Sequence, residues 1–312
     1  MIPEDATAGS GQVTPAVAVE HLTKRYGTVA AVDDLSFTIP TGTITGFLGP
    51  NGAGKTTTFR MLVGLAAPTG GTARVLGQPY VELSDPIKQV GAMLEVSGFH
   101  PTRTARNHLL LLARTAGIAE GRVDELLQLV ELGAAADRAV GGFSSGMRQR
   151  LGLASALLGD PALLLLDEPA NGLDPKGIRW LRQFLRSLAH EQGKTVFVSS
   201  HILAEVAQMV DDVVIINQGR LVTQGPVDTV VAHMGRVVAV RSPDSARLLD
   251  LLTKYDATVT RQDHDRILVS GVDIEEVGRL AAAQNVVLFE LHEEGLTLED
   301  TFLALTETAV AQ

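Results

Sequence analysis

The chain has 312 residues, a formal net charge of −10 and no cysteine. Its length allows one large domain and a small one, and its 45% hydrophobic and 20% charged residues are typical of a globular protein. The lack of cysteine excludes disulfides, thiolate zinc sites and cysteine nucleophiles and fits a reducing cytosol. The negative charge argues against a nucleic-acid partner, because such affinity comes mostly from cationic contacts to phosphate.

Residues 1–15 carry Pro, Gly, Ser, Thr and acidic side chains without the apolar segment of a secretory signal, so we expect a disordered tail. No apolar run approaches the roughly 20 residues of a membrane-spanning helix. The most apolar run covers residues 161–166 and ends at Asp167. Any membrane-spanning part of the system is therefore expected in another chain.

A large domain is expected over residues 16–234, where β-rich and helical segments alternate. Strands are predicted over residues 16–22, 35–39, 43–48, 72–76, 89–94, 162–166, 195–199, 213–216 and 220–222. Helices are predicted over residues 56–65, 104–117, 122–132, 147–158, 176–190 and 203–210. The last two strands flank Asn217-Gln-Gly219, which favours a hairpin. Parallel core strands, antiparallel strands and covering helices together indicate an α/β domain.

A smaller domain is expected over residues 235–312. Its strands are predicted over residues 237–240, 257–260, 267–269 and 286–291. Helices are expected to begin near Ser242, at Asp273 and at residues 297–300. The order strand–helix–strand–strand–helix–strand predicts an α+β, ferredoxin-like unit. This part carries no catalytic constellation, so we expect an interaction or regulatory domain.

Residues 49–57 read Gly-Pro-Asn-Gly-Ala-Gly-Lys-Thr-Thr and fit the phosphate-binding pattern G-x-x-x-x-G-K-[ST], the P-loop. Glycines let the backbone curl so that successive N–H groups point at an anion, and the following helix adds its partial positive charge. Lys55 can reach the outer phosphates, and the Thr56 hydroxyl can ligate Mg²⁺. The expected nucleotide-binding residues are Gly49, Asn51, Gly52, Ala53, Gly54, Lys55, Thr56 and Thr57.

Two carboxylates follow the apolar strand of residues 162–166. Asp167 is placed to hold Mg²⁺, and Glu168 is placed to orient or deprotonate a water. A histidine, His201, stands just beyond the strand of residues 195–199, where it can reach a terminal phosphate. Taken alone, that histidine is more often a surface or core residue than a ligand.

Two further stretches have weaker signals when read singly. Residues 142–150 form a Ser/Gly loop that leads into a helix, where the Ser144 hydroxyl and helix-end N–H groups could bind an anion. Residues 171–175 read Asn-Gly-Leu-Asp-Pro, a turn with proline just before a helix. Neither stretch identifies a site by itself.

Together and in this order, the stretches resemble the ATP-binding subunit of an ABC transporter, over about residues 17–226. The resemblance implies a P-loop ABC-type nucleotide-binding domain with a mixed sheet core, an antiparallel β subdomain and a helical subdomain. It makes residues 49–57 the Walker A motif and residues 163–167 Walker B. The implied catalytic residues are Glu168 and His201. The implied ATP contacts beyond the P-loop are Tyr26, which would stack on adenine, the signature-loop residues Ser144, Ser145 and Gly146, and Asp174.

The chain departs from the family pattern at two places. The signature reads Phe143-Ser-Ser-Gly-Met147 where the family usually has Leu-Ser-Gly-Gly-Gln, and Glu95 stands where a glutamine is usual. The implied contacts to Mg²⁺ are Thr56, Asp167 and Glu95. Both departures, together with the sequences of residues 91–95 and 298–303, resemble members of the daunorubicin- and bacitracin-type drug or antibiotic export subfamily. Members of that subfamily also carry a C-terminal extension.

The resemblance implies an ATPase that powers a separate membrane-spanning permease and exports a drug, antibiotic or lipid-like compound. It implies a head-to-tail dimer with a second copy, in which each ATP lies between one P-loop and the other copy's signature loop. The implied location is cytoplasmic, peripheral on the inner face of the cell membrane. The segment 95–107 is the expected docking surface for the permease.

Two alternatives stay open at this point. One is a soluble ABC ATPase acting on ribosomes or DNA, although such proteins usually have two ATPase cores, coiled coils or zinc modules. The other is a GTPase switch, because Asp174-Pro-Lys-Gly177 and Thr253-Lys-Tyr-Asp256 superficially fit GTPase motifs. Both motifs are short enough to arise by chance.

Overall fold

The computed structural model describes residues 14–94, 98–201, 209–233, 236–253, 257–261 and 263–295. Contacts between Cα atoms divide the chain into two units, Met1–Gln224 and Gly225–Gln312. The division falls after Gln224, somewhat earlier than the boundary expected after residue 234. Each unit is described below by itself.

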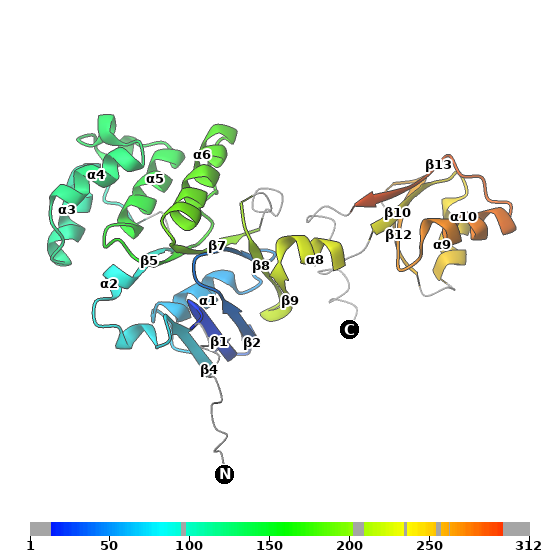
Figure 1. Cartoon of the computed structure of the whole chain (residues 1–312), viewed down its shortest axis with the longest axis horizontal. Helices are drawn as coiled ribbons and strands as arrows, with labels where there is room; N and C mark the ends of the chain where they lie inside the picture. Colours follow the sequence, from blue (N-terminus) through cyan, green and yellow to red (C-terminus); the bar gives the residue numbers. More distant parts are fainter. Residues whose placement is uncertain are drawn as a thin grey trace, which may run out of the picture. The chain divides into compact units, whose positions relative to one another are not determined.

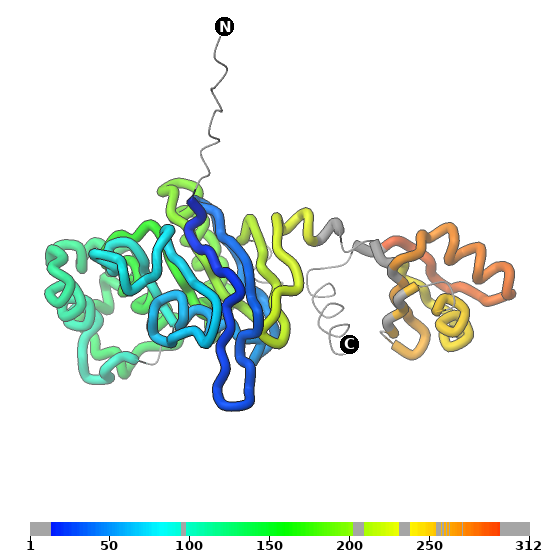
Figure 2. The backbone as a smooth tube through the Cα atoms, turned by 90° about the horizontal axis from the view of Figure 1, so that it is seen from below, coloured from blue at the N-terminus to red at the C-terminus, as the bar shows by residue number. Residues whose placement is uncertain are grey.

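The first unit contains two sheets (Figure 1). The larger has the strand order β5-β6-β7-β3-β8-β9, and its first five strands in this order pair in parallel. Its strands are β3 Ile44–Leu48, β5 Val90–Met93, β6 Leu163–Leu166, β7 Thr195–Ser200, β8 Asp212–Asn217 and β9 Arg220–Pro226. The smaller sheet is antiparallel, with the order β2-β1-β4, and consists of β1 Val17–Tyr26, β2 Val29–Ile39 and β4 Gly70–Val75. Figure 2 traces the long β1–β2 hairpin.

Four phenylalanines join the two sheets into one core. Phe37 comes from β2, Phe47 from β3, Phe197 from β7 and Phe59 from α1 (Lys55–Leu62), and all four are buried. Their ring centroids lie 5.0–5.8 Å apart in tilted and edge-on pairs, which is the favoured geometry for aromatic contacts. The helix that follows the P-loop is thereby fixed between both sheets, directly beneath the site.

Three helices of the first unit begin at a capping side chain. Thr104, Ser144 and Asp174 each accept a hydrogen bond from the backbone N–H three residues later, so they start α3, α5 and α6. Helices α3, α4 and α5 contact one another and form a helical subdomain beside the sheet (Figure 1). The bounds are α2 Pro86–Gln89, α3 Ala105–Thr115, α4 Gly121–Leu129, α5 Ser145–Ala156 and α6 Pro175–Arg186, which continues as a π turn over Ser187–Glu191.

The predicted hairpin at residues 217–219 is confirmed. Gln218 and Gly219 both have positive φ, 49° and 81°, between the adjacent strands β8 and β9. Positive φ at both central residues is the turn geometry that matches the twist of paired antiparallel strands. The α/β class, with its mixed core sheet, antiparallel β subdomain and helical subdomain, is likewise as predicted.

The second unit has the predicted ferredoxin-like topology. Its antiparallel sheet has the order β11-β12-β10-β13, and the two helices that follow β10 and β12 pack on one face of it. The elements are α8 Val227–His233, β10 Arg236–Arg241, α9 Ser245–Leu252, β11 Thr258–Arg261, β12 Arg266–Ser270, α10 Ile274–Ala283 and β13 Glu290–Gly295. Asp273 caps α10 through the Glu276 N–H, as its sequence predicts.

The strand predicted over residues 286–291 is wrong in position, because β13 is Glu290–Gly295. Asn285 has a φ of 53°, and the Val286 N–H bonds back to the Ala281 carbonyl at 2.9 Å. This is the closing arrangement of a helix C-terminus, and it leaves Val286 buried against the core. Val286 thus belongs to the turn that closes α10 after Ala283, and the strand begins only at Glu290.

Several expectations fall outside the described residues. They are the disordered tail, the metal contact Glu95, most of the helix over 203–210, the helix beginning at 297–300 and most of the Thr253–Asp256 motif. Among the helices that the structure does describe, none has the length and apolarity needed to cross a bilayer.

Candidate functional site

The P-loop runs from the end of β3 to the start of α1, and its backbone requires glycine at Gly54. Gly54 has a φ of 105°, and a Cβ placed there would lie 2.5 Å from the Ala31 carbonyl oxygen of β2. Such a contact is impossible without moving backbone, and the positive φ itself disfavours any side chain. Gly52 also has a positive φ, 83°. The loop therefore curls tightly at the N-terminus of α1, the arrangement that binds phosphate.

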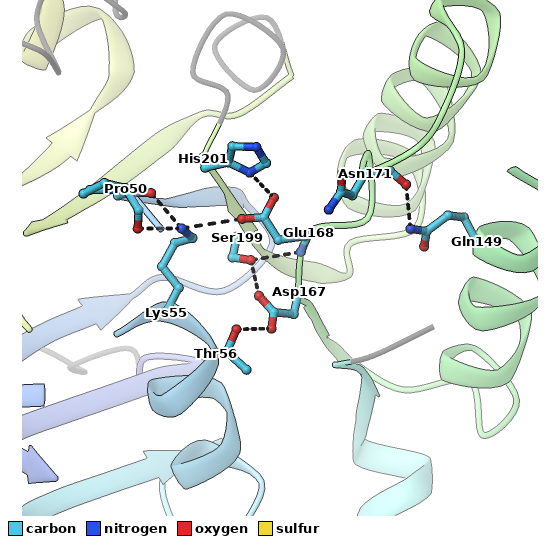
Figure 3. A network of polar contacts seen from close by, with 10 residues as sticks. Pro50, Lys55, Thr56, Gln149, Asp167, Glu168, Asn171, Ser199 and His201 are labelled. Atoms are coloured by element: carbon cyan, nitrogen blue, oxygen red, sulfur yellow. Dashed lines mark hydrogen bonds and ion pairs between the residues drawn. The ribbon is translucent and has the colours of Figure 1, made fainter. Parts of the chain in front are cut away.

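The Lys55 side chain is folded into this loop (Figure 3). Its Nζ donates to the Gly49 carbonyl at 2.7 Å and the Pro50 carbonyl at 3.2 Å, and lies 3.5 Å from Glu168 Oε1. Burial lowers the pKa of the Lys55 ammonium, while the charges of Glu168 and Asp167 raise it by less. The loop thus holds a poorly hydrated cation that an anionic ligand would satisfy.

Asp167, at the end of β6, accepts hydrogen bonds from two hydroxyls. Thr56 donates to Asp167 Oδ2 at 2.6 Å, and Ser199 donates to Asp167 Oδ1 at 2.5 Å. Burial raises the pKa of Asp167, and the two hydroxyl bonds oppose this rise. A carboxylate whose charged form is disfavoured by burial would gain from a nearby cation.

A magnesium ion fits the donors at this position. The Thr56 hydroxyl and the Asp167 carboxylate supply the hard oxygen ligands that Mg²⁺ prefers. In the described part of the chain, no group of three His, Asp or Glu side chains could hold a metal by itself. This suits Mg²⁺, which is usually held by one or two carboxylates together with substrate phosphates rather than by a protein cage.

Glu168 is presented in an unusual backbone conformation. It has a φ of 51°, which a non-glycine residue adopts only when the surroundings enforce it. Its N–H donates to Ser199 Oγ at 2.9 Å, and its Oε2 lies 2.8 Å from His201 Nδ1. Ser199 therefore holds Asp167 and Glu168 at once, and His201 and Lys55 lie on either side of the Glu168 carboxylate (Figure 3).

These side chains face a cavity of about 520 Å³. It is lined by Tyr26, Ala31, Asn51, Gly52, Gly54, Lys55, Thr56, Thr57, Glu168, Asn171 and His201. The structure therefore brings most of the predicted nucleotide contacts and both predicted catalytic residues to one opening. Gly49 and Ala53 belong to the same loop without lining the cavity, and Asp167 lies under Thr56.

The signature residues and Asp174 do not line this cavity. Ser144 and Asp174 cap α5 and α6, and Ser145 lies 3.4 Å from an Arg148 nitrogen. Within one chain the signature loop and the P-loop are therefore separate, as the expected two-copy site requires.

Sequence reasoning missed three contributors, namely Ala31, Asn171 and Ser199. Asn171 lines the cavity and accepts a hydrogen bond from Gln149, whereas Ser199 joins the two carboxylates. Ser199 could have been found, because β6 and β7 are parallel neighbours and polar residues at the carboxyl ends of such strands converge. Ala31 contributes through its backbone and leaves no signal in the sequence.

Comparison with known proteins extends across both units. The sequence pattern of a family described as ABC transporter matches residues 32–171, and that of a domain of unknown function matches residues 236–299. The chain is 44% identical over 241 residues to the bacitracin transport ATP-binding protein BcrA of Bacillus licheniformis, covering 77% of this chain and 79% of the relative. It is 37% identical over 294 residues to the Nod factor export ATP-binding protein I of Burkholderia orbicola (strain AU 1054), covering 92% and 95%.

A solved structure agrees with the sequence relatives. A dimeric post-hydrolysis state of an ATP-binding cassette, bound to ADP and phosphate, matches with a TM-score of 0.61 and 25% identity, covering 68% of this chain and 98% of that chain. The chain therefore belongs to the ATP-binding subunits of ABC transporters, the ATPases whose hydrolysis of ATP drives transport by a separate membrane component.

Proposed function

We propose that ATP binds in the 520 Å³ cavity with Mg²⁺ and is hydrolysed by the residues that line it. Lys55 leaves Glu168 and binds the outer phosphates, while Tyr26 stacks on the base. The other P-loop contacts, including Asn51, Ala53 and Thr57, complete the phosphate cradle. Thr56 and Asp167 would hold Mg²⁺, with Glu95 as the further contact that the family resemblance implies, and the bound ion would neutralise charge on the phosphates.

Glu168 acts as the general base in this proposal. It accepts the proton of the attacking water, and His201 fixes the carboxylate through Oε2 and reaches the terminal phosphate. The observation that carries the assignment is the convergence of Lys55, Glu168 and His201 on one cavity, with Asp167 directly beneath it. When Lys55 moves from Glu168 to the phosphates, Glu168 Oε1 loses its ion-pair partner and becomes free to accept the proton of the water.

The second half of each site comes from another copy of the chain. Ser144, Ser145 and Gly146 do not line the cavity of their own chain, and the related cassette above was solved as a dimer. In a head-to-tail dimer, the N-terminus of α5 supplies N–H groups to the ATP of the partner. Asp174, in the turn before α6, lies at the same interface.

A dimerisation experiment tests this arrangement. In a Glu168→Gln background, ATP should convert monomers into dimers, and adding Ser144→Arg should keep the protein monomeric while ATP still binds, because arginine blocks the trans contact. Sedimentation velocity with and without ATP measures the change. Thr104→Arg is the matched control, since it places arginine at the cap of another helix in the same subdomain. Dimers that persist in Ser144→Arg would refute the trans contact.

The transporter partner is a separate membrane-spanning permease. The chain acts on the cytoplasmic side, bound peripherally to the inner face of the cell membrane. Relatives named for bacitracin transport and Nod factor export support export of a drug, antibiotic or lipid-like compound. Co-purification with a membrane protein, rather than with ribosomes or DNA, tests this part of the proposal.

The second unit serves assembly rather than catalysis. Its described part contributes no residue to the cavity, yet the alignment with a relative covers 92% of this chain and so extends into this unit. Deleting residues 236–312 should leave ATP binding to the first unit intact and weaken dimerisation or binding to the permease. Calorimetry with ATP and pull-down of the co-expressed permease measure the two effects. Unimpaired assembly after the deletion would show that this unit only stabilises the chain.

A further inference from the structure

The first turn of α5, the helix that begins in the signature loop and is called the signature helix below, packs against the turn that follows Glu168. A Cβ placed at Gly172 would lie 3.3 Å from Ser145 Cβ, and one placed at Gly146 would lie 3.4 Å from a Leu173 methyl carbon. In both places a glycine backbone lies against a side chain of the other segment, and Gly172 also has a φ of 76°, which favours glycine. The first turn of α5 and the turn 170–174 therefore pack against each other with little space between them.

One buried side chain adds a directional contact to this packing. Gln149, on α5, is 6% exposed and donates through Nε2 to the Asn171 carbonyl at 3.0 Å (Figure 3). Its Oε1 atom is buried and has no hydrogen-bond partner within the described residues. Burying an amide with one unpaired atom costs free energy, so an apolar side chain would fill this space at lower cost. We therefore expect the Gln149–Asn171 hydrogen bond to have a role beyond packing.

The bond continues to the catalytic carboxylate. The Asn171 N–H donates to the Glu168 carbonyl at 3.1 Å, so the Asn171 peptide connects Gln149 on one side to Glu168 on the other. Glu168 has the strained φ of 51° that surrounding contacts must hold. Asn171 also lines the cavity beside Glu168.

We propose that Gln149 is a positioning residue for Glu168, acting through the Asn171 peptide and tying the base to the signature helix of the same chain. This inference rests on the proposed function, in which Glu168 is the base and α5 contacts the ATP of the other copy. Movement of α5 on contact with that ATP is then transmitted to Glu168. Each copy thereby places its own base only when its signature loop is engaged.

Gln149→Met tests the proposal, because methionine keeps the length and fills the buried space but cannot donate to Asn171. We expect kcat for ATP hydrolysis to fall roughly ten- to hundredfold, the range that small misplacement of a catalytic group produces, while ATP affinity and KM stay unchanged. The ATP-bound dimer should accumulate, because binding and closure are intact and hydrolysis is slow. A residue that only stabilised α5 would instead lose dimer and affinity together.

Two comparisons keep the outcome interpretable. Ser155→Ala removes another side-chain hydrogen bond of α5, from Oγ to the Leu151 carbonyl, and should leave kcat unchanged. Thermal unfolding shows whether Gln149→Met is folded. A folded Gln149→Met with wild-type kcat overturns the positioning role alone, and so does one that loses ATP affinity and dimer. Absence of hydrolysis in the wild type would instead overturn the proposed function, and this inference with it.

Discussion

Replacing Glu168 by glutamine is expected to lower the rate of ATP hydrolysis roughly 10²- to 10⁴-fold, the contribution typical of a general base. The amide is nearly the same size as the carboxylate, so the turn and the cavity should keep their shape. It cannot accept the proton of the attacking water. ATP binding relies on Lys55, Thr56 and the P-loop backbone, so affinity should be retained and the ATP-bound dimer should accumulate.

Single-turnover hydrolysis, calorimetric ATP binding and sedimentation velocity separate these effects. Glu125→Gln is the matched control, because it makes the same substitution at an exposed residue paired with Arg122 on α4, away from the cavity. The control should hydrolyse ATP at the wild-type rate. If Glu168→Gln also did so, another group would be the base, and the geometry around His201 would have to be reinterpreted.

Local chemistry explains why so much of the fold could be predicted. The P-loop glycines, the capping residues Ser144 and Asp273, and the turn at Gln218 and Gly219 each determine their own backbone within a few residues. The wrong position predicted for the strand at Val286 shows where such local reasoning fails. Its β-branched side chain favours a strand, but the preceding Asn285 adopts the left-handed conformation that ends α10. Tertiary burial of Val286 then outweighed its strand propensity.

The site shows what local reasoning cannot reach. Motif positions predicted Lys55, Thr56, Asp167, Glu168 and His201, because each would carry its chemistry in its own side chain. The contacts that position them are long-range. Ser199 is 32 residues from Asp167 in the chain, and Gln149 is 22 residues from Asn171. The packing of β6 beside β7, and of α5 against the turn after Glu168, shows which polar side chains contact these residues.

Replacing Lys55 by methionine should abolish ATP binding at ordinary concentrations without weakening the fold. Removing one partner of a buried, hydrogen-bonded charge pair costs about 2–5 kcal/mol, which corresponds to roughly a 30- to several-thousandfold rise in Kd. The Lys55 Nζ lies in the P-loop, where it donates to the Gly49 and Pro50 carbonyls and pairs with Glu168, and in the proposed site phosphates take over from Glu168.

The stability of Lys55→Met should behave differently from its ATP affinity. Burial lowers the pKa of Lys55 in the folded protein, so near neutral pH folding disfavours its ammonium relative to the unfolded chain, and removing that charge relieves the cost. Methionine keeps the apolar stem that packs in the loop. The free energy of unfolding should therefore hold or rise, as at other sites where function is favoured over stability. Urea unfolding and calorimetry on one sample decide the matter, because a marked loss of stability would mean that Lys55 is structural, whereas an unchanged Kd would remove it from the ATP site.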